Sequence, residues 1–273
     1  MVNIILSEDI KIFRRATLAS VVTSTYPMIV VGCYFGVTPW VFNKLSIDES
    51  DFSFAILLFG VFFIISNQIA GRILVPKYGT KLIMSLAFPL VTLSTFLAII
   101  SSSYFYFLLT FIPAGIGWGA SGPIGGIHSQ LIEKHFKKII TPYYAMGFNL
   151  GILIGGTLAG IIMRNNYEPY LFFGILFLLS IFVSFFVYSF GLPRNLDFKG
   201  AGEKFKIPET NVLLFGFLLF FVFGSGGIIM DWSTLWLSKD LNAPLYLASM
   251  GLIFFSIGGI FANLFSNSLI KLF

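Results

Sequence analysis

The sequence contains little charge, a single cysteine and only two histidines. Charged residues make up 11% of the chain, whereas a soluble domain carries about a quarter, so a soluble globular fold is excluded. Cys33 has no second cysteine with which to form an intrachain disulfide. His128 and His135 are too few to build the multi-histidine iron sites of membrane desaturases and hydroxylases. We therefore expect no metal and no other cofactor.

Two further patterns are missing. The chain has no loop of the form Gly-x-x-x-x-Gly-Lys-Ser/Thr, which argues against ATP-driven transport by this chain. Lys239 and Lys271 flank apolar runs without lying inside them, so no buried lysine is placed for a retinal Schiff base. The net charge of +5 follows from where the basic residues lie in the chain, and it does not indicate nucleic-acid binding.

Apolar residues are abundant, at 57% of the chain, and they include 34 phenylalanines. They form runs of about 20 residues, the length that crosses a bilayer as an α-helix. These runs are too long and too continuous for the strands of an outer-membrane barrel, which alternate polar and apolar over about 10 residues. We expect an all-α, polytopic membrane helical bundle in contact with the lipid bilayer. The eight predicted spans are residues 16–40, 52–70, 82–101, 104–127, 140–163, 168–191, 211–236 and 244–266.

Positive charge is distributed unevenly between the connections. Fourteen of the 17 lysines and arginines lie at the N-terminus, in every second connection or after the last span, and only Lys44, Arg164 and Lys239 lie on the other side. By the positive-inside rule, both termini are cytoplasmic. Asp48 is then outside, and Lys206 is in a cytoplasmic loop.

The longest and most polar connection comprises residues 192–210 and follows six spans. Six helices, a linker and further helices form the layout of a transporter built from two six-helix halves. The predicted organisation is therefore an N-terminal six-helix half (1–191), a cytoplasmic linker (192–210) and the first two helices of an incomplete second half (211–273).

Three stretches have informative patterns. Residues 71–81 end in Lys77-Tyr78-Gly79-Thr80-Lys81, where the glycine permits a tight turn between two helices. Residues 115–160 hold two glycine-rich spans separated by Glu133 and a basic turn, and glycines four residues apart let helix backbones approach closely. Residues 227–237 read Gly-Ile-Ile-Met-Asp-Trp-Ser-Thr-Leu-Trp-Leu.

These stretches resemble the major facilitator superfamily, and most closely its fucose-permease-like and sugar-efflux-like bacterial branches. The family's second loop reads roughly Gly-x-Leu-x-Asp-Arg-Phe-Gly-x-Arg, and here Pro76 stands where the acid is expected. The resemblance implies secondary transport by alternating access in the bacterial cytoplasmic membrane. It also implies a small polar or amphipathic solute as partner and a conformational-gating role for Lys77, Gly79 and Lys81. The fourth span lacks the Arg or carboxylate usual in the superfamily, which places proton coupling by the N-terminal half in doubt.

Polar side chains inside the spans are the candidate solute-binding and coupling groups, because their burial in lipid is costly. The candidates are Asp231, Trp232, Asn149, Thr25, Tyr26 and His128. Structural explanations stay open for each kind of residue. The hydroxyl of Thr25 can bond its own helix, Asn149 can bond a neighbouring helix, Trp232 can anchor at the interface, and His128 can act as a gate or a packing residue.

Secondary transport is the leading hypothesis, with protons as a candidate coupling ion and Asp231 as the group that carries them. The alternative is a membrane-embedded enzyme or a receptor-like helical bundle. An aspartyl protease needs a pair of carboxylates, and Asp231 has no second carboxylate inside a span. We therefore expect no enzymatic activity.

The final residues, 269–273, stop where a second copy of the loop at 71–81 is expected to begin. Only two spans follow the linker, whereas the superfamily fold has six there. We expect this chain to be a fragment whose coding sequence continues with four more spans. An eight-span protein that completes itself by oligomerising is the alternative.

Overall fold

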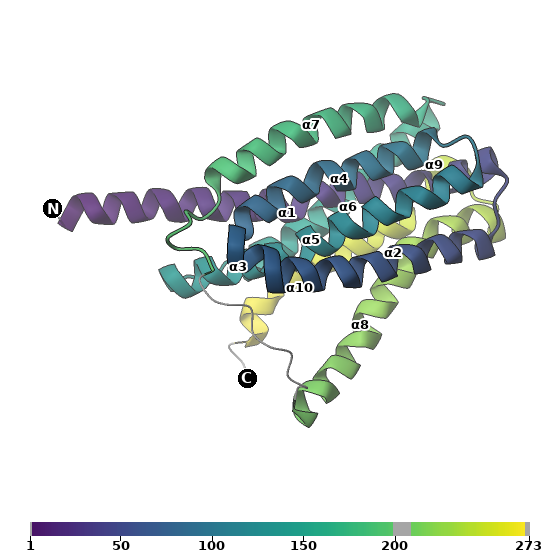
Figure 1. Ribbon diagram of the computed structural model, residues 1–273. Helices are drawn as coiled ribbons and strands as arrows, with labels where there is room; N and C mark the ends of the chain where they lie inside the picture. Colours follow the sequence, from purple (N-terminus) through teal and green to yellow (C-terminus); the bar gives the residue numbers. More distant parts are fainter. Residues whose placement is uncertain (1, 199–208, 271–273) are drawn as a thin grey trace.

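The computed structural model describes residues 2–198 and 209–270, and all regular structure within these ranges is helical (Figure 1). The elements in chain order are α1 (Val2–Leu45), α2 (Glu49–Ile69), η1 (Ala70–Leu74), α3 (Val75–Tyr78), α4 (Thr80–Ile100), α5 (Tyr104–Phe136), α6 (Thr141–Arg164), α7 (Pro169–Phe190), α8 (Thr210–Leu235), η2 (Trp236–Asp240), α9 (Leu245–Ala248) and α10 (Met250–Ile270). The η elements are short π-helices that continue α2 and α8. Lys206, Lys271 and most of the predicted linker lie outside the described residues.

The predicted all-α fold and its eight spans are confirmed, since eight helices in the described ranges are long and apolar enough to cross a membrane. Helices satisfy every backbone group internally, which lipid requires. Two helices are longer than predicted. The first begins at Val2 because no glycine or proline interrupts residues 2–15. The helix α5 continues to Phe136, and Lys137 ends it in the left-handed conformation at φ 55°.

The glycine stripe of α6 packs directly on the backbone of α1, as the sequence predicted. A Cβ atom added to Gly151 would meet the Thr25 carbonyl oxygen, and one added to Gly155 would meet the Ile29 carbonyl oxygen. In return, Gly32 of α1 faces Ile152 of α6, whose carbonyl oxygen would lie 2.8 Å from an added Cβ. Small residues therefore bring these two helices into backbone contact.

Helix α5 uses its glycines in the same way on two other neighbours. Gly115 and Gly119 face the backbone of α2 at Phe59 and Phe63, whereas Gly117 faces Val91 of α4. Glu133, near the end of α5, accepts hydrogen bonds from the backbone N–H groups of Ile140 and Thr141 and so caps the start of α6.

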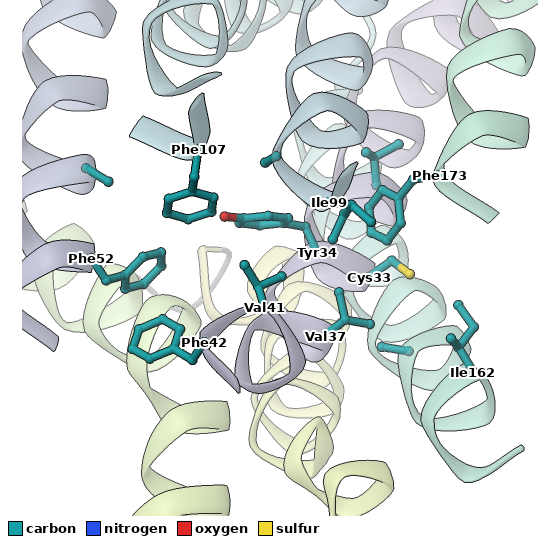
Figure 2. Packing of buried hydrophobic residues seen from close by; sticks show 14 of the residues in the cluster. Cys33, Tyr34, Val37, Val41, Phe42, Phe52, Ile99, Phe107, Ile162 and Phe173 are labelled. Carbon is teal, nitrogen blue, oxygen red and sulfur yellow. The ribbon is translucent and has the colours of Figure 1, made fainter. Parts of the chain in front are cut away.

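The largest buried apolar cluster lies between α1, α2, α4, α5, α6 and α7 (Figure 2). Tyr34 of α1 belongs to this cluster together with Cys33 and Val37. Figure 2 shows the Tyr34 hydroxyl directed towards the side where Phe107 and Phe52 lie. The Tyr34 hydroxyl is thus a buried polar group at the edge of an apolar cluster.

The helices after the linker contact the first part of the bundle unevenly. Helices α9 and α10 pack along α6, where Tyr246 of α9 faces Gly160, and Leu252 and Ile253 of α10 face Gly156. The C-terminal part of α8 contacts α1. Residues 210–225, at the N-terminal end of α8, are exposed, and Figure 1 shows this N-terminal end diverging from the bundle. The end of the bundle that holds residues 46–48 and 241–244 is called the predicted outer end below, and the opposite end the predicted cytoplasmic end.

Candidate functional site

A cavity of about 300 Å³ lies between α1, α2, α4, α5 and α8, nearer the predicted outer end. Four of the five helices belong to the predicted N-terminal half, and α8 is the first helix after the linker. A space of this size between packed helices is typical of a small-molecule site. The cavity depends on α8 approaching α1, so it is a product of the tertiary arrangement.

The cavity wall is rich in aromatic rings. They come from α1, α2 and α5, and they are Tyr34, Phe35, Phe52, Phe59, Phe111 and Trp118. Met28, Val31, Ile56 and Met230 add flexible or branched apolar surface. The wall therefore suits a ligand with an apolar or aromatic body.

The polar groups on this wall are few. Asp231 of α8 lies within electrostatic reach of Tyr34 on α1, whose buried hydroxyl has no hydrogen-bond partner among the described residues. The hydroxyls of Ser94, Thr95 and Thr110 also line the cavity, but each donates to a carbonyl of its own helix, at 2.7, 2.9 and 2.6 Å respectively. Asp231, the Tyr34 hydroxyl and the Trp118 indole N–H are thus the polar groups of the wall that make no hydrogen bond within the described residues.

Trp232 follows Asp231 in α8 but lies outside the cavity wall. Its ring packs edge-on against Phe52, with 5.6 Å between the ring centroids. Two residues further on, the Thr234 hydroxyl donates to the Phe35 carbonyl oxygen at 2.9 Å. This stretch of α8 therefore attaches the helix to α1 and α2 beside the cavity.

The other predicted residues of the first and fifth spans lie away from the cavity. Thr25 donates to the Val21 carbonyl oxygen of its own helix at 2.8 Å, and Tyr26 donates to the Leu176 carbonyl oxygen of α7. Asn149 donates to the Ala145 carbonyl oxygen at 3.2 Å and faces Gly259 of α10. The structure does not bring these three residues together with Asp231.

His128 lies in a buried network at the predicted cytoplasmic end. Its Nδ1 atom is 2.7 Å from the Thr80 hydroxyl, which donates to Asp197 Oδ1 at 2.8 Å. The Thr80 backbone N–H donates to Asp197 Oδ2 at 2.8 Å, and the Leu192 N–H donates to His128 Nε2 at 3.4 Å. The network ties the start of α4 and the interior of α5 to the segment after α7.

The predicted gating loop lies beside this network. Gly79 adopts φ 88°, which a side chain would disfavour, and an added Cβ would also meet the carboxylate of Asp197. The Nζ atoms of Lys77 and Lys81 lie 5.0 and 4.8 Å from the ring centroids of Tyr78 and Tyr188.

Arg194 binds the carbonyl oxygens at the C-terminal end of α3. It donates to the Pro76 carbonyl oxygen at 2.8 Å and the Lys77 carbonyl oxygen at 3.2 Å. It comes from the connection after α7, and it supplies the charge that complements a helix C-terminus.

An ion pair closes the predicted outer end. Lys239 Nζ lies 2.6 Å from Glu49 Oε1, and the same ammonium lies 4.7 Å from the centroid of the Phe42 ring. The pair connects η2, at the end of α8, with the first turn of α2. It therefore holds the first helix after the linker against the preceding helices on the outer side of the cavity.

Sequence reasoning missed several of these residues. Tyr34 had no visible signal because tyrosine in an apolar run is common in a core or at an interface. Asp197 and Arg194 lie in a connection where charge is expected. Glu49 follows Asp48 in a predicted outer connection, and nothing in the local sequence points to its partner Lys239, which is 190 residues away in the chain.

The profile of the Major Facilitator Superfamily matches residues 21–273, which is nearly the whole chain. The chain belongs to the major facilitator superfamily. It is also 20% identical, over 224 residues, to an uncharacterized MFS-type transporter of Yersinia pestis, and that match covers 80% of this chain and 56% of the relative. The chain thus spans just over half the length of this curated relative.

Superfamily membership is in keeping with the eight apolar helices of the described residues, each long enough to cross a membrane. Within the described residues, no three side chains of His, Cys, Asp and Glu are grouped closely enough to hold a metal ion. The cavity wall offers a ligand aromatic rings, the Asp231 carboxylate, the Tyr34 hydroxyl and the Trp118 indole N–H.

Proposed function

We propose that this superfamily member carries out secondary active transport of a small amphipathic solute by alternating access, with the solute bound in the cavity at Asp231. The observation that carries the proposal is the position of that cavity. It is enclosed partly by α1, α2, α4 and α5 and partly by α8, so its walls belong to both predicted halves. A site between two halves that rock against each other is opened alternately to either side.

The arrangement around the cavity supports a conformation closed to the outside. The Glu49–Lys239 ion pair and the Thr234–Phe35 hydrogen bond join α8 and η2 to the earlier helices on the outer side. Residues 210–225 of α8 are exposed, which supports an opening towards the cytoplasm. In this proposal α1–α7 form one rigid half and α8–α10 belong to the other, with both termini in the cytoplasm of a bacterial cell.

Asp231 is the proposed coupling group, with the proton as coupling ion. Among the described residues on the cavity wall, Asp231 is the only one with a carboxylate side chain, so it is the group that can take up and release a proton there. A carboxylate in a membrane site is costly unless it is protonated or paired, so exchanging a proton for a solute there links the two fluxes. Asn149, which cannot change its charge, has a packing role against α10 in this proposal.

Transport by proteoliposomes that enclose a pH-sensitive dye tests the proposal. A panel of small amphipathic solutes of positive, neutral and negative charge is added outside, and solute-dependent proton movement and solute accumulation are recorded. We expect at least one solute to be accumulated by the wild-type protein, and Asp231→Asn to abolish the coupled proton movement. Asp240→Asn is the matched control, because Asp240 is exposed and is not part of the cavity wall.

Three outcomes decide the proposal. Loss of coupling in Asp231→Asn, with Asp240→Asn and Asn149→Ala retaining it, supports the assignment. Unchanged pH-dependent uptake in Asp231→Asn removes Asp231 as the coupling group. A protein that accumulates no solute of any charge, but turns over a lipid, contradicts transport and favours the enzyme alternative.

A further inference from the structure

We propose that the cavity takes a monovalent organic cation with an aromatic or bulky apolar body, and that Asp231 is its counter-charge. This inference rests on the proposed function, because the ligand it describes is the transported solute. It narrows the solute from any small polar or amphipathic molecule to one charge class.

The charge balance of the cavity is the first argument. Of the described residues on the cavity wall, Asp231 is the only one with a charged side chain. Two of the cations at the predicted outer end are engaged elsewhere. Lys239 pairs with Glu49, and Lys44 donates to the Ile99 carbonyl oxygen at 2.7 Å. A bound cation would supply the compensation that a carboxylate in a low-dielectric site requires.

The aromatic wall is the second argument. Six rings surround the space that Asp231 faces, and cations are attracted to the negative faces of such rings, most strongly where water is excluded. Phe35 and Tyr34 share α1, and Trp118 lies across on α5. An apolar body also gains from leaving water for this wall. Charge attraction and apolar burial therefore favour the same kind of ligand.

The hydrogen-bonding capacity of the wall is the third argument. Ser94, Thr95 and Thr110 use their single O–H donors on their own helices, so they offer a ligand only acceptor lone pairs. An anion needs donors, and a sugar needs many donors and acceptors to replace its hydration. The unpartnered Tyr34 hydroxyl can accept from an ammonium N–H beside Asp231. The unengaged donors of the wall are the Tyr34 O–H and the Trp118 indole N–H, and both share the cavity with the Asp231 carboxylate, which repels an anion. The wall is thus poorly matched to an anion or a sugar and well matched to a cation.

Calorimetric titration of the 273-residue chain in nanodiscs of zwitterionic lipid tests the inference, because such a lipid does not itself concentrate cations. The probes are benzyltrimethylammonium, which carries a fixed positive charge, neopentylbenzene, its neutral carbon isostere, and phenylacetate. We expect the cation to bind more tightly than both other probes. We expect Asp231→Asn to weaken cation binding by about tenfold or more, and Asp231→Glu to retain most of it.

The controls separate this inference from the proposed function and from misfolding. Asp240→Asn should bind the cation as the wild type does, and each variant must match the wild type in thermal unfolding midpoint. If the neutral probe binds as tightly as the cation, or the cation does not bind, the cation inference is overturned. The transport proposal then still stands if vesicles accumulate a neutral or anionic solute, whereas accumulation of no solute at all overturns both.

Discussion

Lys239 Nζ lies 2.6 Å from Glu49 Oε1, and this contact joins two segments that are 190 residues apart in the chain. It is the one ion pair between side chains that the described residues form. Both partners are partly exposed, at 36% and 57% of their side-chain surface, so the pair contributes no more than about 1 kcal/mol. A contribution of this size suits a contact that breaks in every cycle of the proposed transport.

Breaking the outer ion pair should open the cavity to the outside more often. Glu49→Gln is introduced with Ser94→Cys and Cys33→Ala, so that the only thiol lies on the cavity wall. We expect the rate of labelling by a membrane-impermeant maleimide from outside to rise, by up to about fivefold if the pair is worth about 1 kcal/mol. The charge-reversed double variant Glu49→Lys with Lys239→Glu should restore the slow rate. Equal labelling in all of these proteins would show that the pair does not keep the outer side closed.

Removing the Thr80 hydroxyl should weaken the attachment of the segment after α7. Thr80→Val leaves the backbone bond to Asp197 in place but removes the donor to Oδ1 and the contact with His128. Because Asp197 is 4% exposed, the lost bond to a buried carboxylate should cost about 1–3 kcal/mol of unfolding free energy. Thermal unfolding followed by tryptophan fluorescence measures this.

The matched control for Thr80→Val is Thr157→Val. Thr157 is exposed, and its hydroxyl donates only to the Leu153 carbonyl oxygen of its own helix at 2.7 Å. Its replacement should leave the unfolding midpoint nearly unchanged. Equal midpoints for the two variants would argue against a structural role for the buried network.

A large side chain at Gly151 should force α6 away from α1. The Cβ and the rest of a leucine would meet the Thr25 carbonyl oxygen and Met28 Cβ, and overpacking of this kind costs about 1–3 kcal/mol. We expect Gly151→Leu to lower the yield of monodisperse protein and its unfolding midpoint. Gly60→Leu is the control, since nothing lies within 4 Å of a Cβ at Gly60. Wild-type yield and midpoint for Gly151→Leu would contradict the close packing.

Thiol labelling of intact cells tests the predicted orientation. In a Cys33→Ala background, a membrane-impermeant maleimide should reach Asp48→Cys and should not reach Lys138→Cys. Both positions are exposed and lie at opposite ends of the bundle, beside α2 and α6 respectively. The reverse pattern of labelling would invert the topology and place the ion pair of Glu49 and Lys239 in the cytoplasm.

Much of the fold followed from the sequence because lipid imposes simple rules on it. Runs of about 20 apolar residues must be helical where no water is present to satisfy the backbone. Glycines four residues apart, such as Gly151 and Gly155, predicted a close helix contact that α1 and α6 do form. These features depend on residues that are near each other in the chain.

The site was predictable only in part, for the same reason. Asp231 stood out because a carboxylate is rare inside an apolar run, and it does line the cavity. Thr25, Tyr26 and Asn149 are equally polar by sequence, but the faces they occupy turn them towards helix backbones and other spans. Which face of a helix lines a cavity depends on the rotation of that helix against its neighbours.

The sequence alone determined the class of protein, the number of spans and the separation of its charges, since each is a property of composition and local order. Only the tertiary structure decided that Tyr34 and Asp231 line one cavity, that Glu49 pairs with Lys239, and that Thr80 donates to Asp197. Each pair joins residues from distant parts of the chain. Their meeting depends on how the helices pack, and packing is set by side-chain contacts over the whole bundle and not by any single segment.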